Sequence, residues 1–253
     1  MGILNVTPDS FYDGGKFNAS DLALKRAENI LRDGGKIIDI GGYSSRPGAD
    51  NVAEQDELKR VIPVIENIRQ RFPSAFISVD TFRSNVAKEA VAAGAHIIND
   101  ISGGDGDVNM FTTIAKLNVP YIMMHMQGTP QNMQINPTYT NVTNDIISYF
   151  EKKIDKLTSL GATDILLDPG FGFGKTIEHN YTLLKRLSEF CKLNRPLLIG
   201  ISRKSMIYKK LGITAEESLA GTIALNAIAL EKGASILRVH DVKEAVDLVT
   251  LLR

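Results

Sequence analysis

Three polar side chains each close a short apolar run, in a pattern that suits recognition of a flat ligand rich in N–H groups. They are Asp80 after AFISV, Asn99 within HIIND and Asp168 after DILL. A carboxylate that faces an amidine-like pair of N–H groups makes a bidentate, charge-assisted contact that discriminates strongly between ligands. If the three runs meet at one end of a sheet, these side chains would converge on a heterocycle that carries ring N–H and amino groups.

A second set of side chains, Asn5, Arg238 and His240, is typical of anion binding. Arg238 and His240 are two residues apart in SILRVH, so they share one face of a strand. A closed barrel places its last strand beside its first, which would bring Asn5 next to them. We therefore expect a phosphate-like anion there. A helix cap or a turn explains any single polar strand end equally well, but caps do not need Lys204, Arg238 or His240.

Polar residues also crowd the opening stretch ILNVTPDSFYDGG, residues 3–15. Asp9 and Asp13 follow Asn5 with no helical pattern between them. They either form Asx and Asp-Gly-Gly turns or face the same ligand as Asn5.

The elements that would position these groups recur along the whole chain as apolar runs, each followed by an amphipathic helical pattern. The runs are 2–6, 36–42, 75–80, 96–100, 120–126, 164–170, 196–202 and 235–240. Most are continuously apolar, as strands buried on both faces should be. The first helical segment, 20–35, has Ser20 or Asp21 as a possible N-cap. Eight such units predict an α/β fold, a (β/α)8 TIM barrel forming a single domain over 1–253, with a doubly wound open sheet as the alternative.

Composition argues against several classes of protein. Lys plus Arg equals Asp plus Glu at 29 each, so neither a nucleic acid nor an acidic membrane is expected as a partner. No apolar run approaches the ~18 residues of a membrane span, and the first residues lack a signal-peptide pattern, which favours a cytoplasmic location. Cys191 is the single cysteine, so an internal disulfide is excluded, and its surroundings LSEFCKL predict a buried packing residue.

Three motifs admit other interpretations. GFGFGKT, residues 170–176, looks like a phosphate-binding P-loop, but three residues rather than four separate Gly170 from Gly174. Lys204 could form a Schiff base, although its neighbours in SRKS favour anion binding. His125, within MMHM, is more typical of a packed or ligand-lining residue than of a metal ligand.

Taken together and in order, the motifs resemble the signature segments of the dihydropteroate synthase family. The matching segments are GILNVTPDSFYDGG, IIDIGGYSSRPGA, SVDT, IIND, IMMHMQG, LLDPGFGFGK, SRKSM and LRVHD, from residue 2 to about residue 243. The resemblance implies a pterin-binding transferase of folate biosynthesis and a sulfonamide target. Such an enzyme condenses 6-hydroxymethyl-7,8-dihydropterin diphosphate with 4-aminobenzoate, giving 7,8-dihydropteroate and pyrophosphate, with Mg2+ as cofactor.

The resemblance also implies residue roles. The pterin-binding positions fall on Asp80, Asn99, Met124, Asp168, Lys204 and Arg238. The diphosphate positions fall on Asn5, Arg238 and His240, and Asn5 would also bind the metal. The aminobenzoate positions fall on Phe11, Ser45, Arg46, Pro47, Phe173 and Ser205, with Lys204 shared. The catalytic residues would be Asp13, Lys204, Arg238 and His240.

On this interpretation the stretch after Asn5 is a lid whose Asp9 and Asp13 close over the diphosphate and the metal. Asp13 would stabilise a cation-like centre beside the pterin ring as the leaving group departs. The chain departs from the family pattern in two places: Ser45 stands in the usual S-T-R-P, and Tyr43 precedes that motif where Glu or Val is frequent. Both departures are expected at the aminobenzoate end, where they bear on sulfonamide sensitivity.

Two other functions stay open on the sequence alone. A pterin-binding methyltransferase barrel would share the pterin-binding groups but would have no use for the SRKSM and RVH anion groups. A catalytically inactive pterin-binding protein would release no pyrophosphate. Segment 217–234 is apolar around more of its circumference than an outer barrel helix needs, which favours a homodimer. The other expected partners are the two small-molecule substrates that the family resemblance implies.

Overall fold

The computed structural model describes residues 1–7, 19–43 and 52–252. Within them eight parallel strands pair in sequential order, β1 to β8. The strands are β1 Gly2–Asn5, β2 Ile37–Gly41, β3 Phe76–Asp80, β4 Ile97–Asp100, β5 Tyr121–Met124, β6 Ile165–Asp168, β7 Leu197–Ile199 and β8 Ala234–Leu237. Val239, two residues after β8, forms a parallel bridge with Gly2 of β1, which closes the sheet into a barrel.

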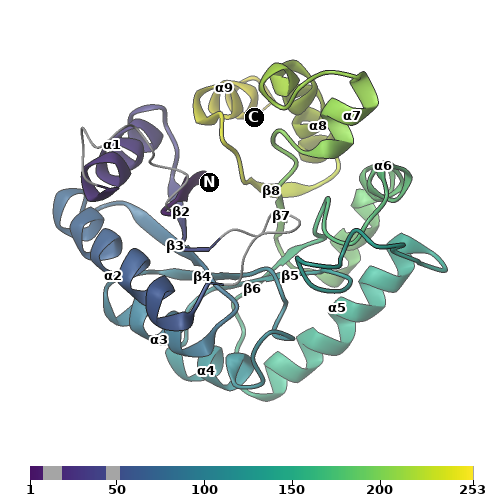
Figure 1. Ribbon diagram of the computed structural model, residues 1–253. Helices are drawn as coiled ribbons and strands as arrows, with labels where there is room; N and C mark the ends of the chain where they lie inside the picture. The colour runs from purple at the N-terminus through teal and green to yellow at the C-terminus, as the bar shows by residue number, and fades with distance from the viewer. Residues whose placement is uncertain (8–18, 44–51, 253) are drawn as a thin grey trace.

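Helices alternate with the strands and surround them, as Figure 1 shows. They are α1 Ala19–Arg32, α2 Glu54–Arg71, α3 Ser84–Ala92, α4 Met110–Leu117, α5 Val142–Ser159, α6 Ile177–Lys185, α7 Ser205–Leu211, α8 Leu219–Glu231 and α9 Val242–Leu252. Two 3-10 helices, η2 Leu187–Leu193 and η3 Glu216–Ser218, lie between them. The TIM-barrel prediction is therefore confirmed, and the alternative of a doubly wound sheet is wrong because the strand order never reverses.

Burial explains why these runs became strands. In β4, Ile98 belongs to the main core between strands and helices, whereas Ile97 joins a separate cluster with Ile122, Leu166 and Leu198. Successive side chains of a strand point to opposite faces, so this smaller cluster fills the lower barrel interior. Side chains two residues further along the same strands must then point into the upper interior.

Element boundaries differ from the prediction at a few ends. The predicted runs for β5, β6, β7 and β8 extend two or three residues past the ends of the strands, because each run includes residues of the following loop. Neither Ser20 nor Asp21 is the N-cap of the first helix, since α1 already begins at Ala19. Ser20 instead accepts a hydrogen bond from Asn67 Nδ2 on α2 at 2.9 Å.

Candidate active site

The register of the sheet brings the predicted pterin-binding residues into one ring at the carboxyl ends of the strands. Across the first four strands, Asn5 pairs with Gly41, Gly41 with Asp80, and Asp80 with Asn99. On the other side of the barrel, Met124 of β5 pairs with Asp168 of β6. Asn99, Met124 and Asp168 each lie two residues beyond a side chain of the lower interior cluster, so they point into the barrel mouth.

Arg238 ties together two buried carboxylates from β2 and β3. Its Nε donates to Asp39 Oδ2 at 2.6 Å and its Nη2 donates to Asp80 Oδ2 at 2.9 Å. Asn99 Nδ2 also donates to Asp39 Oδ2, at 3.1 Å, and the Tyr43 hydroxyl donates to Asp80 Oδ1 at 2.8 Å. We refer to these five side chains as the carboxylate cluster.

The electrostatics of the carboxylate cluster follow from two acids that share one guanidinium. Burial raises the pKa of Asp80 to about 7; Arg238 opposes this shift, and the negative charge of Asp39 adds to it. Burial alone would lower the pKa of Arg238, but Asp39 and Asp80 raise it above its ordinary value. Asp39 Oδ1 is buried without a hydrogen-bond partner in the described part of the chain. The cluster therefore contains one carboxylate oxygen at the barrel mouth that can still accept a hydrogen bond.

Lys204, after β7, faces the opposite side of the mouth. Its Nζ donates to the carbonyl oxygen of Phe171 and lies 4.5 Å from the centre of the Phe173 ring. Burial lowers its pKa to about 8, although Asp168 acts in the other direction. Burial likewise raises the pKa of Asp168, and Lys204 counteracts that rise. A carboxylate and an ammonium group thus face the same space.

The loop after β6 is shaped by Lys175, a side chain only 3% exposed. Lys175 Nζ donates to the carbonyl oxygens of Gly170 and Phe173, both at 2.9 Å, and lies 3.0 Å from His125 Nδ1. Burial lowers the pKa of Lys175, and burial followed by the charge of Lys175 lowers that of His125. The ammonium group of Lys175 is therefore already bound by carbonyl oxygens of its own loop, which argues against the P-loop interpretation of GFGFGKT. His125 is a packed residue, as predicted.

Close packing of this loop also explains one of its glycines. Gly170 has φ of +71°, and a Cβ there would lie 1.9 Å from the carbonyl oxygen of His125. Any side chain at this position would push the loop off the end of β5.

The seam between β8 and β1 carries the predicted anion-binding residues. His240 Nδ1 lies 3.1 Å from Ser202 Oγ, and the His240 backbone N–H donates to the same oxygen at 3.2 Å. Burial, and next the charge of Arg238, lower the pKa of His240 to about 4. The imidazole is consequently neutral at physiological pH, and its Nδ1 shares a hydrogen bond with the serine hydroxyl whose direction depends on the tautomer. Arg26 of α1 binds the His240 carbonyl at 2.7 Å, which fixes the seam from outside.

Arg203 does not join the anion-binding residues that its SRKS context suggested. It forms a bidentate pair with Asp241, with Nε to Oδ2 at 2.9 Å and Nη2 to Oδ1 at 2.8 Å. Its third nitrogen, Nη1, donates to the carbonyl oxygens of Ala215 and Glu216. The guanidinium therefore connects β7, η3 and the start of α9.

The remaining predicted residues are placed as follows. Met124 packs with Tyr43 and Ile101, and Phe173 lies against that cluster. Ser205 begins α7 directly after Lys204. Five predicted site residues, and Asp9 of the proposed lid, lie outside the described residues: Phe11, Asp13, Ser45, Arg46 and Pro47.

Sequence reasoning assigned no site role to Asp39 or Lys175 and misplaced one residue elsewhere. Asp39 resembles any other polar strand residue, and Lys175 was considered only as part of a P-loop. Tyr43 was expected at the aminobenzoate end, and its contact with Asp80 was not predicted. A polar residue between Ile38 and Ile40, on the interior face of its strand, was the available signal for Asp39. Cys191 is exposed, so the prediction that it is buried is wrong. It lies on the outer side of η2, against Lys232 and Gly233.

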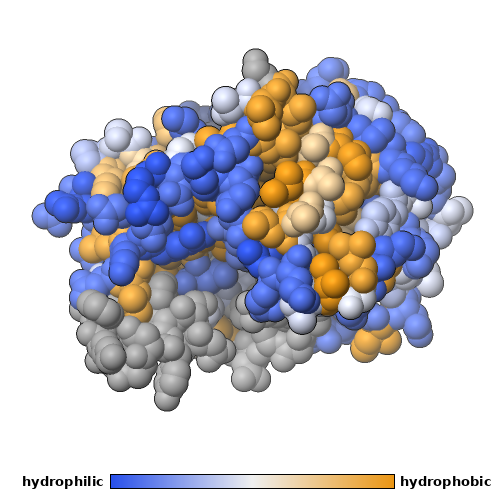
Figure 2. All heavy atoms as spheres, turned by 90° about the horizontal axis from the view of Figure 1, so that it is seen from above, coloured by the Kyte–Doolittle hydropathy of each residue, from blue (hydrophilic) through white to orange (hydrophobic). Residues whose placement is uncertain are grey.

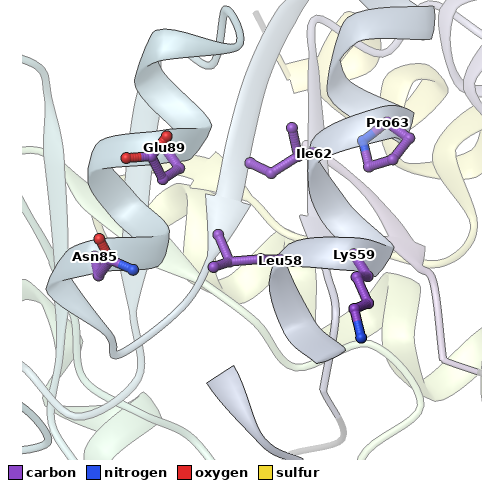
Figure 3. A pocket seen from close by; sticks show the side chains of 6 residues that line it. All are labelled: Leu58, Lys59, Ile62, Pro63, Asn85 and Glu89. Atoms are coloured by element: carbon purple, nitrogen blue, oxygen red, sulfur yellow. The ribbon is translucent and has the colours of Figure 1, made fainter. Parts of the chain in front are cut away.

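A surface groove lies outside the barrel, away from the strand ends that carry these groups. Figure 3 shows its lining side chains, which come from α2 and α3. They are Leu58, Lys59, Ile62, Pro63, Asn85 and Glu89. None belongs to the ring at the carboxyl ends of the strands. In the described part of the chain, no helix is long and apolar enough to cross a membrane.

Comparison with known proteins identifies the family. The model of the pterin-binding enzyme family matches residues 1–240. The dihydropteroate synthase of Escherichia coli is 49% identical over 249 residues, which cover 98% of this chain and 88% of the relative. The chain belongs to the dihydropteroate synthase family. It is thus a transferase of folate biosynthesis, condensing the pterin diphosphate with 4-aminobenzoate to 7,8-dihydropteroate and pyrophosphate.

Two solved structures of the family share the architecture. The dihydropteroate synthase of Yersinia pestis, in a complex with a sulfonamide drug, is 47% identical with a TM-score of 0.94, covering 100% of this chain and 92% of that one. The synthase of Xanthomonas albilineans, in complex with 7,8-dihydropteroate, is 37% identical with a TM-score of 0.89, covering 100% of this chain and 91% of that one. Both are similar to this chain over its whole length.

Proposed function

We propose that the strand-end residues of this chain divide the family reaction into a pterin side and a diphosphate side. The observation that carries this proposal is the ring of polar side chains at the barrel mouth. Acids from β3 and β6, an amide from β4 and cations that follow β7 and β8 all face one space, and they come from strands far apart in the sequence.

The pterin side consists of Asp80, Asn99, Asp168 and Lys204. Carboxylate and amide oxygens would accept from the ring N–H and amino groups, and the Lys204 ammonium would donate to a ring oxygen or nitrogen. Met124 would contact the flat face of the ring, since it belongs to the apolar cluster next to these groups. Arg238 would lie against the ring while it remains paired with the two acids.

The diphosphate side consists of Asn5, Arg238 and His240 at the seam. Arg238 supplies the positive charge, and the neutral His240 would donate from Nε2 in the tautomer whose Nδ1 accepts from Ser202. These donors would stabilise the negative charge that the leaving pyrophosphate develops. Mg2+ belongs to this proposal, with Asn5 as one ligand.

The residues around Asn5 suit such an ion. Mg2+ prefers oxygen ligands, and proteins commonly supply only one or two of them while substrate phosphates provide the others. Side-chain oxygens of Asn5 and Asp80 lie close to Gly41, since a Cβ there would be 3.5 Å from Asn5 Oδ1 and 3.9 Å from Asp80 Oδ2. Among residues 1–7, 19–43 and 52–252, no three His, Cys, Asp or Glu side chains are grouped to hold a metal. A bound Mg2+ would supply charge neutralisation of the diphosphate.

The aminobenzoate side would include Phe173, whose ring centre lies 4.5 Å from Lys204 Nζ, and Ser205, which begins α7 directly after Lys204. In the reaction, the C–O bond between the pterin methylene and the diphosphate breaks, and the leaving oxygen keeps the electron pair. The amine nitrogen of 4-aminobenzoate then forms the new C–N bond and loses a proton. Sulfonamide drugs, found on the Yersinia pestis relative, would compete for this part of the site.

A homodimer formed through the last helices is also part of the proposal. The fully buried residues of α8 are Thr222, Asn226 and Ala229, whereas its larger aliphatic side chains are only partly buried or exposed. Leu211, Ile228 and Leu251 add exposed apolar surface on α7, α8 and α9. Figure 2, which views the side where these helices lie in Figure 1, shows an apolar area there. Contiguous apolar surface of this kind marks interaction sites.

A cytoplasmic location stays a prediction from the sequence.

Pyrophosphate release tests the assignment of both sides. The wild-type protein, with the pterin diphosphate, Mg2+ and 4-aminobenzoate, should release pyrophosphate only when all three are present. Asp80→Ala and Asn5→Ala should each lower kcat/KM at least about a hundredfold, because each removes a polar contact from a desolvated site. Asp247→Ala, an exposed acid on α9, is the matched control and should match the wild type.

Two outcomes would overturn parts of this proposal. A folded wild-type protein that binds the pterin but releases no pyrophosphate would be a binding protein. Release that survives in Asp80→Ala, with unchanged pterin affinity, would remove Asp80 from the pterin side.

A further inference from the structure

Tyr43 lies at the barrel mouth, two residues after the end of β2. It is 9% exposed, and its hydroxyl donates to Asp80 Oδ1 at 2.8 Å. Its ring packs edge-on against Phe82, with ring centres 5.1 Å apart and planes at 82°. Ile101 and Met124 complete its surroundings. The side chain therefore touches both the apolar lining of the mouth and a carboxylate assigned to pterin.

The two oxygens of Asp80 are held from different directions. Arg238 binds Oδ2 and Tyr43 binds Oδ1. The torsion that turns a carboxylate about its Cβ–Cγ bond has a broad energy profile, so the hydrogen-bond partners decide its orientation. Arg238 can exchange partners when a ligand arrives, since Asp39 also binds it. The Tyr43 hydroxyl is then the contact that keeps Asp80 from rotating.

Charge within the carboxylate cluster gives the hydroxyl a second role. Asp39 and Asp80 face one guanidinium, so ionising both leaves an excess negative charge that neutral donors must stabilise. Asn99 donates to Asp39, and Tyr43 donates to Asp80 in the same manner. Burial, and next the charge of Asp80, raise the pKa of Tyr43 well above its ordinary value, so its hydroxyl keeps its proton. Hydrogen bonds to an ionised acceptor are about twice as strong as neutral ones.

We propose that Tyr43 is a positioning residue for pterin binding, which acts by holding the Asp80 carboxylate in the orientation that faces the ligand. The proposal rests on the assignment of Asp80 to the pterin in the proposed function. On this proposal, the ring of Tyr43 has a packing role and its hydroxyl determines the affinity for pterin. The hydroxyl should leave the affinity for 4-aminobenzoate unaffected.

The test is Tyr43→Phe, which removes the hydroxyl and keeps the ring against Phe82. Calorimetry with 6-hydroxymethyl-7,8-dihydropterin diphosphate and Mg2+ should give a Kd about tenfold higher than that of the wild type. The KM for 4-aminobenzoate and kcat should stay within about twofold. Tyr181→Phe is the matched control: it removes a hydroxyl that binds the Met206 carbonyl at 3.0 Å, between α6 and α7, and should bind the pterin normally.

A double-mutant cycle shows whether the effect passes through Asp80. In an Asp80→Ala background, Tyr43→Phe should cause no further loss of pterin affinity. An additive loss there would overturn the proposal, and so would an unchanged Kd in the single variant. If Asp80→Ala itself left pterin binding unchanged, the proposed function would fail instead. Unfolding curves of all variants identify any change that acts through the fold, and an effect on both substrates would mark Tyr43 as merely structural.

Discussion

The two sides of the barrel mouth compensate their buried charges with different partners. On the β2, β3 and β8 side, Asp39 and Asp80 are neutralised by Arg238, so side chains satisfy one another. On the β5, β6 and β7 side, Lys175 and Lys204 donate to backbone carbonyls of the loop after β6. One side is a network of exchangeable ion pairs, and the other is a loop bound to its own lysine.

This difference assigns different tasks to the two sides. Ion pairs between side chains can exchange partners with a ligand while the strands stay in place. A loop whose carbonyls are held by a buried ammonium group has a fixed shape, and it sets the position of the Phe173 ring and of Lys204. We therefore expect ligand recognition to depend on charge at one side and on backbone shape at the other.

The largest effect is expected from breaking the lysine side. Lys175→Met keeps the length and apolar character of the side chain but removes its donors. The carbonyl oxygens of Gly170 and Phe173 then lose a buried partner, and the free energy of unfolding should fall by about 3 kcal/mol. Urea unfolding followed by circular dichroism measures this change.

The matched control is Lys185→Met, because Lys185 is exposed at the end of α6. Its stability should stay within about 0.5 kcal/mol of the wild type. A similarly small effect for Lys175→Met would show that the loop does not need its lysine.

A pH profile of kcat/KM for the pterin diphosphate probes both sides at once. Asp80, with a pKa of about 7, must lose its proton to accept from the pterin, and Lys204, with a pKa of about 8, must keep its own to donate. Activity should therefore peak between pH 7 and 8 and fall about tenfold per pH unit on either side. In Lys204→Arg the alkaline fall should vanish, because arginine stays charged. A flat profile from pH 5 to 9 would contradict this pair of assignments.

Asp39→Asn sharpens the carboxylate side. The charge of Asp39 raises the pKa of Asp80, so its removal should shift the acidic limb of the pH profile to lower pH, by less than about one unit. The alkaline limb should stay where it is. A shift to higher pH would mean that the loss of the Asp39–Arg238 ion pair changes the pKa of Asp80 more than the loss of a neighbouring negative charge does.

The smallest effect is expected outside both regions. Lys243 and Asp247 form an exposed pair one turn apart on α9. Lys243→Ala should change the free energy of unfolding by no more than about 0.5 kcal/mol, because solvent screens such pairs. Thermal unfolding at low and high salt checks this, and a larger loss would show that surface pairs cannot serve as the baseline for Lys175.

Sequence patterns predicted the barrel well, because apolar runs such as HIIND and DILLD leave few alternatives. The runs around β1 to β4 match the strands to within about one residue at either end. Asp80, Asn99 and Asp168 could also be found, since each closes its run and strand ends share one face of the barrel.

The remaining features depend on three-dimensional contacts that spacing does not encode. Lys175 is buried where the carbonyl oxygens of Gly170 and Phe173 accept from it, and nothing in GFGFGKT distinguishes this from an exposed lysine. The Tyr43 contact depends on the loop direction after β2. Cys191 lies in an apolar segment, but the 3-10 geometry of η2 turns it outward.

The seam between β8 and β1 has a kinetic consequence. Ile3 N–H donates to the Val239 carbonyl and Val239 N–H to the Met1 carbonyl, both at 3.0 Å, across almost the whole chain. Contacts of such sequence separation carry the highest loop-closure cost and tend to form late in folding. Asn5, Arg238 and His240 share an edge only after that step. A nascent chain would therefore complete the edge proposed to bind the diphosphate only with its last strand in place, and anion binding at that edge is expected to report the end of folding.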